Sequence, residues 1–100
     1  MRVDFTPEAT SDLEEIALYI ARDNPRTAEA WIDKLIDRAE KAGIHPRAGR
    51  VVPEFGERAV REVFVRTYRI IYRIEPDRIV VLTVLEGHHR LRALPGASKK

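Results

Sequence analysis

The spacing of apolar residues changes once along this chain of 100 residues, from a helical period in the first half to a strand period in the second. Apolar residues at three- and four-residue spacing predict two amphipathic helices. Their stripes are Ala9, Leu13, Ile16, Ala17 and Ile20, then Ala28, Trp31, Ile32, Leu35, Ile36 and Ala39. After residue 58 the chain is rich in β-branched and aromatic residues, which favour strands. The pattern therefore predicts helices packed on a sheet.

Capping residues mark where both helices begin. Thr6 and Asn24 can each accept a hydrogen bond from an unpaired backbone N–H, and Pro7 and Pro25 suit the first helical position. Because Asn24 and Pro25 stand between the two stripes, the helices should form an αα-hairpin. We expect Gly43 to end the second helix in the left-handed conformation.

Four strands are predicted, separated by turn residues. A short one covers Arg2–Phe5, and residues 44–58 form a connecting loop with prolines and glycines. A meander follows, its last two strands joined by a turn at residues 75–78. Its strands are Val60–Val65, Tyr68–Ile74 and Ile79–Leu85. We therefore expect an α+β fold of order β-α-α-β-β-β, with the hairpin on a small, mostly antiparallel sheet, as one domain over residues 1–96 and a tail at 97–100.

The middle strand of the meander should have two different faces. Alternation places Tyr68, Ile70, Tyr72 and Ile74 on the face toward the helices. The opposite face receives Arg69, Ile71 and Arg73, with Val81 beside them and Arg61 able to join from the neighbouring strand. Such a face is either an ordinary solvated side of the sheet or, because it mixes arginine with apolar residues, a protein interface.

Charge is distributed unevenly along the chain. Residues 1–43 carry six basic and ten acidic side chains, whereas residues 44–100 carry twelve basic and six acidic ones. The basic half suggests contact with a polyanion or an acidic protein surface. The absence of cysteine excludes disulfides and thiolate catalysis, and no apolar run approaches the ~20 residues of a membrane span. We expect a cytoplasmic protein with no cofactor and no membrane contact.

Six segments show a recognisable order and spacing: Phe5–Ala9, Asp12–Ile16, Tyr19–Ala21, His45–Arg50, Val65–Ile74 and Ile79–His88. Together they resemble the ParE branch of the RelE/ParE superfamily of bacterial type II toxins, which includes plasmid-stabilisation proteins. The resemblance extends from about Val3 to about Leu94.

This resemblance implies a toxin that a cognate antitoxin, ParD-like or similar, neutralises by wrapping an extended segment around it. ParE-like members inhibit DNA gyrase by binding and trap its cleaved DNA. RelE-like members have a similar fold but cut messenger RNA on the ribosome without a metal. A third alternative is a non-toxic copy that only forms the antitoxin complex.

Residues that a nuclease would need are partly present. Arg69 and Arg90 match phosphate-binding arginines of RelE-like nucleases, but the lysines of the preceding strand (residues 61–65) and the C-terminal catalytic tyrosine are missing. His88 and His89 could supply an acid or base, although solvated or structural histidines are more common. Adjacent histidines on a strand point to opposite faces, so no metal site is expected. The balance favours a toxin that acts by binding rather than as an enzyme.

The residues expected to contact the antitoxin or the target belong mainly to the arginine-bearing face. They are Arg61, Arg66, Arg69, Ile71, Arg73 and Arg90. We expect the antitoxin tail to cover this face and the groove beside the helical hairpin, with acidic residues opposite Arg69 or Arg73.

Overall fold

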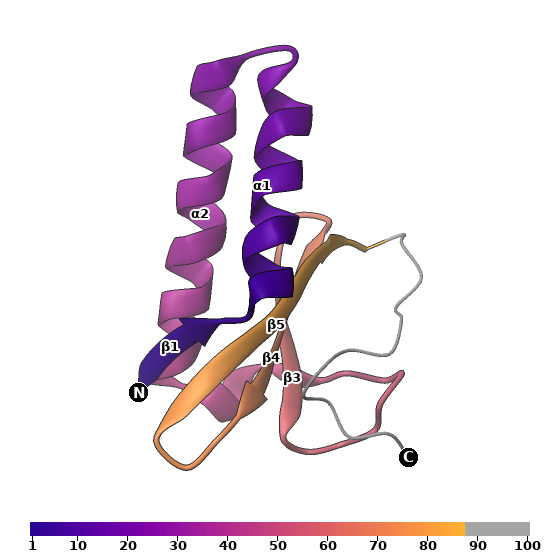
Figure 1. The fold of residues 1–100 in the computed structure, drawn as a ribbon. Coiled ribbons are helices and arrows are strands. Elements are labelled where there is room, and N and C mark those ends of the chain that lie inside the picture. Colours follow the sequence, from indigo (N-terminus) through magenta and orange to yellow (C-terminus); the bar gives the residue numbers. More distant parts are fainter. Residues whose placement is uncertain (88–100) are drawn as a thin grey trace.

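The computed structural model describes residues 1–87 and confirms the expected α+β order (Figure 1). Two short elements, η1 and β2, lie within the segment expected to be only loop. The elements are β1 (Arg2–Phe5), α1 (Pro7–Ala21), α2 (Pro25–Ile44), the 3-10 helix η1 (Pro46–Ala48), β2 (Arg50–Val51), β3 (Val60–Val65), β4 (Tyr68–Ile74) and β5 (Arg78–Glu86).

All five strands belong to one sheet of order β1-β5-β4-β3-β2. β1 runs parallel to β5, and the other neighbours are antiparallel. The αα-hairpin rises from one face of this sheet, with its turn far from the strands (Figure 1). Neither helix of residues 1–87 is long and apolar enough to cross a membrane.

The predicted caps start both helices. The Thr6 hydroxyl accepts a hydrogen bond from the Ala9 amide at 3.0 Å and donates one to the Leu82 carbonyl, also at 3.0 Å. The Asn24 side chain accepts from the amides of Arg26 and Thr27. Thr6 therefore both begins α1 and ties it to β5.

The main core lies between the hairpin and the sheet. Ile70 and Tyr72 of β4 are fully buried there with Leu35 of α2, as their predicted face requires. The Tyr72 hydroxyl donates to the Pro46 carbonyl, so the polar end of this buried ring is satisfied. Ile36, expected in the core stripe, is instead 37% exposed.

Gly43 is a helical residue, so the prediction of a left-handed C-terminal position is wrong. α2 continues through Ile44, and the positive-φ glycine of residues 1–87 is Gly56. A Cβ atom at Gly43 would lie 2.6 Å from Cγ2 of Val3. The absence of a side chain therefore lets β1 approach α2 closely.

A second apolar cluster lies on the outer face of the sheet, away from the helices. Its buried members, Val52, Val60, Ile71 and Leu82, are joined by partly buried Phe55, Val80 and Leu85. Val81, predicted to stand beside Ile71, belongs to the helix-side core instead. The register explains the difference, because Tyr72 pairs with Val81 and Ile71 pairs with Thr83, which leaves Leu82 as an extra residue in β5.

Candidate functional site

The predicted arginine-bearing face exists, but it is covered. Arg69, Ile71 and Arg73 lie on the outer face of β4, as alternation requires. Ile71 is 0% exposed and Arg69 is 6% exposed. Val52 and Phe55, from the β2–β3 loop (residues 52–59), pack in the same cluster. The expectation of an open surface is therefore wrong, whereas a binding role for these residues stays a prediction.

Arg61 does not join the other arginines. It is paired with Tyr72 across β3 and β4, which places it on the opposite side of the sheet from Arg69. Its guanidinium donates to the carbonyls of Arg58, Arg47 and Gly49. These three bonds hold the connecting segment against β3, so the structure gives Arg61 a structural role.

Arg66 lies in the two-residue turn between β3 and β4 and is exposed. Its φ of 54° is in the left-handed region, which a residue with a side chain seldom adopts. Hairpin turns of this length favour glycine or asparagine at such a position. Of the arginines predicted to bind that lie within residues 1–87, Arg66 is the one that is exposed to solvent.

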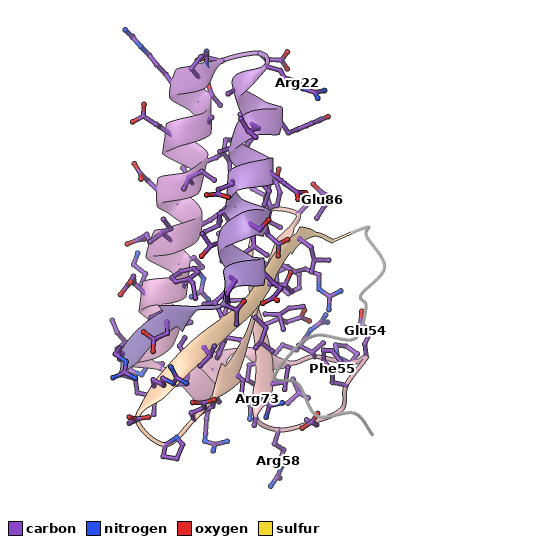
Figure 2. All side chains as sticks on the ribbon, viewed as in Figure 1. Arg22, Glu54, Phe55, Arg58, Arg73 and Glu86 are labelled. Atoms are coloured by element: carbon purple, nitrogen blue, oxygen red, sulfur yellow. The ribbon has the colours of Figure 1, made fainter. Side chains whose placement is uncertain are left out.

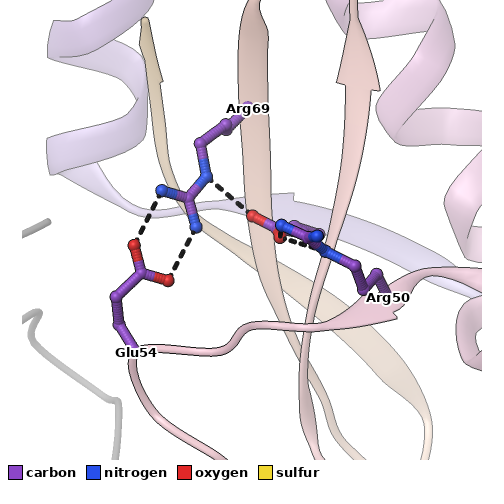
Figure 3. A network of polar contacts seen from close by, with 4 residues as sticks. Arg50, Glu54 and Arg69 are labelled. Atoms are coloured by element: carbon purple, nitrogen blue, oxygen red, sulfur yellow. Dashed lines mark hydrogen bonds and ion pairs between the residues drawn. The ribbon is translucent and has the colours of Figure 1, made fainter. Parts of the chain in front are cut away.

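Arg69 is the centre of an ion-pair network (Figure 3). Its Nε donates to Oε1 of Glu62 at 2.7 Å, and its two Nη atoms donate to the two carboxylate oxygens of Glu54 at 2.9 and 3.0 Å. The other oxygen of Glu62 accepts from Nε of Arg50 at 2.8 Å. Two arginines and two glutamates thus alternate across β2, β3, β4 and the β2–β3 loop.

The members of this network differ in their exposure. The side chain of Glu62 is 0% exposed and that of Arg69 is 8% exposed, whereas Glu54 is 44% exposed and Arg50 60%. The hydrogen bonds from Arg69 hold the pKa of Glu54 below its usual value, and the bond to Glu54 in turn raises the pKa of Arg69. The pair is therefore ionised at neutral pH.

A second carboxylate of the same loop faces Arg73. The Arg73 guanidinium and the Glu57 carboxylate are 3.9 Å apart, and both side chains are largely buried. Nε and Nη2 of Arg73 and Oε2 of Glu57 have no hydrogen-bond partner among residues 1–87. The loop thus places one acid on each outer-face arginine, tightly at Arg69 and loosely at Arg73. In Figure 2, Glu54 and Phe55 lie on the loop at the right, and Arg73 lies to the left of them, toward the strands.

Sequence reasoning missed the acidic members of the network. One signal was available, because the two-residue turn at Arg66 and Thr67 fixes the register of β3 on β4. That register pairs Glu62 with Ile71 and places it diagonal to Arg69. Glu54 and Glu57 lie in a segment without periodicity, and no local pattern indicates where they contact the sheet.

A second candidate surface is a groove between α1 and the end of β5, with a volume of about 660 Å³. Leu18 and Tyr19 are each 70% exposed along it, so both side chains are largely solvent-facing. Oε1 of Glu86 is buried there and has no hydrogen-bond partner in the part of the chain that the structure describes. The α1–β5 groove is lined by Asp12, Glu15, Ile16, Leu18, Tyr19, Arg22, Tyr68, Val84, Leu85 and Glu86.

Tyr68 lines this groove and also contacts the second helix. Its ring packs at 5.7 Å from that of Trp31 with a tilt of 59°. Burial first, and the nearby Glu86 carboxylate second, raise the pKa of the Tyr68 hydroxyl. The groove therefore combines exposed apolar side chains with a mainly acidic rim, a composition typical of a protein-binding surface.

The described residues do not form a catalytic cluster around Arg69. His88, His89 and Arg90, predicted as possible nuclease residues, lie outside the described residues. His45 is exposed in a separate hollow with Pro46 and Pro76. Within residues 1–87, no group of three or more histidine, cysteine or acidic side chains could hold a metal ion.

Comparison with a solved structure and with sequence families identifies the chain. A chain of the structure described as the chromosomal ParDE TA system from P. aeruginosa superposes with a TM-score of 0.71 at 18% identity, over 86% of this chain and 95% of that one. The helical hairpin on a mixed sheet is thus the fold of a chain in a toxin–antitoxin system. The model of the family "ParE toxin of type II toxin-antitoxin system, parDE" matches residues 3–91, and the chain belongs to this family.

A curated relative supports the same superfamily. Toxin RelE3 of Caulobacter vibrioides is 27% identical over 92 residues, which cover 88% of this chain and 96% of the relative. The resemblance to the RelE/ParE superfamily seen in the sequence is therefore confirmed. The family name and this relative's name point to different branches, so the comparisons leave the mechanism open.

Proposed function

We propose that this chain is a ParE-like toxin that inhibits DNA gyrase by binding to it, and that a cognate ParD-like antitoxin neutralises it. Membership of the ParE toxin family supports the class of activity. The observation that carries the choice of mechanism is the state of Arg69. Both Nη atoms and Nε of this side chain are already bonded to the carboxylates of Glu54 and Glu62.

Metal-free RNA cleavage requires cations that are free to bind the scissile phosphate and stabilise its developing charge. Arg69, which matches such a cation in RelE-like nucleases, is neutralised and largely buried. The other arginines of this region are also paired: Arg50 with Glu62 and Arg73 with Glu57. This arrangement favours a toxin that acts through a protein interface.

The proposal can be tested by inducing the chain alone in bacteria and then assaying gyrase with the purified protein. We expect growth to stop, supercoiling to be inhibited, and protein-linked DNA breaks to accumulate. Co-expression of the antitoxin encoded beside this chain should restore growth. If growth continues while folded protein accumulates, the chain is the non-toxic copy that only binds antitoxin; if growth stops and gyrase is unaffected, the target is different.

We place the antitoxin in the α1–β5 groove, where Leu18 and Tyr19 offer apolar area that nothing in residues 1–87 covers. Aromatic side chains of this kind commonly dominate the binding energy of an interface. Replacing either residue by serine should weaken antitoxin binding about tenfold to a hundredfold while leaving the fold intact, because both are solvent-facing. Titration calorimetry would measure this. Glu14→Ser, an exposed change on α1 outside the groove, is the matched control, and equal affinities for all variants would remove the groove from the interface.

A RelE-like ribosome-dependent endoribonuclease is the second candidate, favoured by the likeness to Toxin RelE3. RNA cleavage would require Arg69 to release Glu54 and bind a phosphate, and His88, His89 and Arg90 would take part in the reaction. The two candidates differ in their product, since one leaves broken DNA and the other leaves cut messenger RNA.

A further inference from the structure

Arg69 lies between two carboxylates. Its contact with Glu62 is fixed, whereas its contact with Glu54 can be exchanged for another. Glu62 is fully buried in β3 and accepts from Nε, so it sets the plane of the guanidinium. The two Nη atoms point away from Glu62 and toward Glu54, which belongs to a loop and is 44% exposed (Figure 3). A guanidinium held in this way presents a fork that matches one carboxylate.

We infer that the Arg69 fork is a carboxylate-binding site that Glu54 occupies in the free chain, and that an acidic side chain of a partner segment replaces Glu54 on binding. This inference rests on the proposed function where the partner is the antitoxin, but the fork itself does not depend on it. Glu54 is thus an internal stand-in for the partner's acid.

The local charges favour a single carboxylate over a nucleic-acid backbone. Without Glu54, the pairing of Arg50 and Arg69 with Glu62 leaves one uncompensated positive charge, which one carboxylate neutralises. A polyanion binds through several unpaired cations at once, whereas the fork offers a single guanidinium, because Arg50 and Arg69 share the carboxylate of Glu62. Phe55 and Leu85 of the adjoining cluster also favour a peptide, which can supply apolar side chains next to its acid.

The loop that carries Glu54 is closed by a small number of contacts, which it must lose to open. Its turn is closed by bonds from the amides of Phe55 and Gly56 to the Val52 carbonyl, at 3.1 and 3.0 Å. At its far end the contact of Glu57 with Arg73 is 3.9 Å long, and buried polar atoms of both side chains have no hydrogen-bond partner within residues 1–87. Opening of the loop therefore breaks these two turn bonds, the strong ion pair of Glu54 and the weak one of Glu57, and it exposes the packed Val52 and Phe55.

The first test is a titration with sodium acetate at constant ionic strength, followed by NMR of the arginine side-chain N–H signals. In Glu54→Gln, the Arg69 signals should reach half-saturation at an acetate concentration about tenfold lower than in the unmodified chain, because an attached competitor acts at a high effective concentration. Asp77→Asn, which removes one negative charge from the exposed β4–β5 turn, is the control and should behave like the unmodified chain. No response of Arg69 in Glu54→Gln would overturn the site, and tighter binding of inorganic phosphate than of acetate would replace the carboxylate by a phosphate ligand.

The second test is hydrogen exchange of the Phe55 and Gly56 amides with and without the cognate antitoxin. Faster exchange in the complex is expected, because the antitoxin displaces the loop. If the antitoxin binds and both amides stay protected, the proposed replacement of Glu54 by an acidic side chain of the antitoxin is wrong, and the proposed function is unaffected. If acetate binds as expected but no antitoxin binds the chain, the carboxylate-binding site at Arg69 is supported and the proposed function is wrong.

Discussion

Replacing Glu62 by alanine is expected to lower the free energy of unfolding by about 3–5 kcal/mol, because it leaves the buried Arg69 without the partner that orients it. Domains of this size are stable by only about 5–15 kcal/mol in total. Each kcal/mol corresponds to roughly 4–8 °C in a domain of this length, so the melting temperature should fall by about 12 °C or more. Calorimetry or circular dichroism would measure the change.

Two further variants test whether the loss of stability in Glu62→Ala comes from the charge left on Arg69 or from lost packing. Glu54→Ala should cost much less than Glu62→Ala, because Glu54 is 44% exposed and Arg69 keeps its bond to Glu62. Replacing Glu62 and Arg69 together by leucine should recover most of the loss, because no unpaired charge then remains in the interior. A melting temperature unchanged by Glu62→Ala would show that the network does not contribute to stability.

Purified protein on programmed ribosomes is expected to produce no codon-positioned cuts in messenger RNA. Each pre-organised group that stabilises a transition state can contribute about 10²–10³ in rate. Several such groups are changed here: the nuclease lysines and tyrosine are missing from the sequence, and Arg69 is occupied by Glu54 and Glu62. Cleavage should therefore fall orders of magnitude below that of a functional nuclease. Primer-extension mapping of the transcript would detect it.

Glu54→Gln is the informative control for cleavage, since it frees the Arg69 fork without removing any nuclease residue. If this variant also leaves the transcript intact, the occupied fork is not what suppresses cleavage, and the mechanism by binding is strengthened. Cuts that disappear in His88→Ala or His89→Ala would contradict the proposal and make the chain an enzyme. Cuts by Glu54→Gln alone would mean that the loop inhibits a nuclease.

The elements of this fold were predictable where local signals determine them. The caps at Thr6 and Asn24 and the helical stripes place both helices, and the strand period places β3 and β4 at the residues observed. The role of Gly43 was not predictable, since it depends on Val3, forty residues away. The same is true of the extra residue Leu82, which exchanges the faces of the residues around it.

The candidate site was predictable only in part, for a related reason. Alternation along β4 correctly places Arg69, Ile71 and Arg73 on one face of the sheet. It gives no information on which other segment of the chain packs over that face. Whether such a face is solvated depends on the β2–β3 loop, and a loop without periodicity carries no signal of where it packs. Glu54 and Glu57 therefore convert an expected open arginine face into a covered one.

The pairing of β1 with β5 has a consequence for the order of events during synthesis. β3, β4 and β5 pair with their neighbours in the sequence and can form as soon as they emerge, but Arg2 pairs with Arg78 and Phe5 with Val81. β1 must therefore wait for β5, and closing so long a loop is a slow step of folding. A nascent chain interrupted before residue 78 offers β1 no partner, so the five-stranded sheet is complete only after β5 has been synthesised.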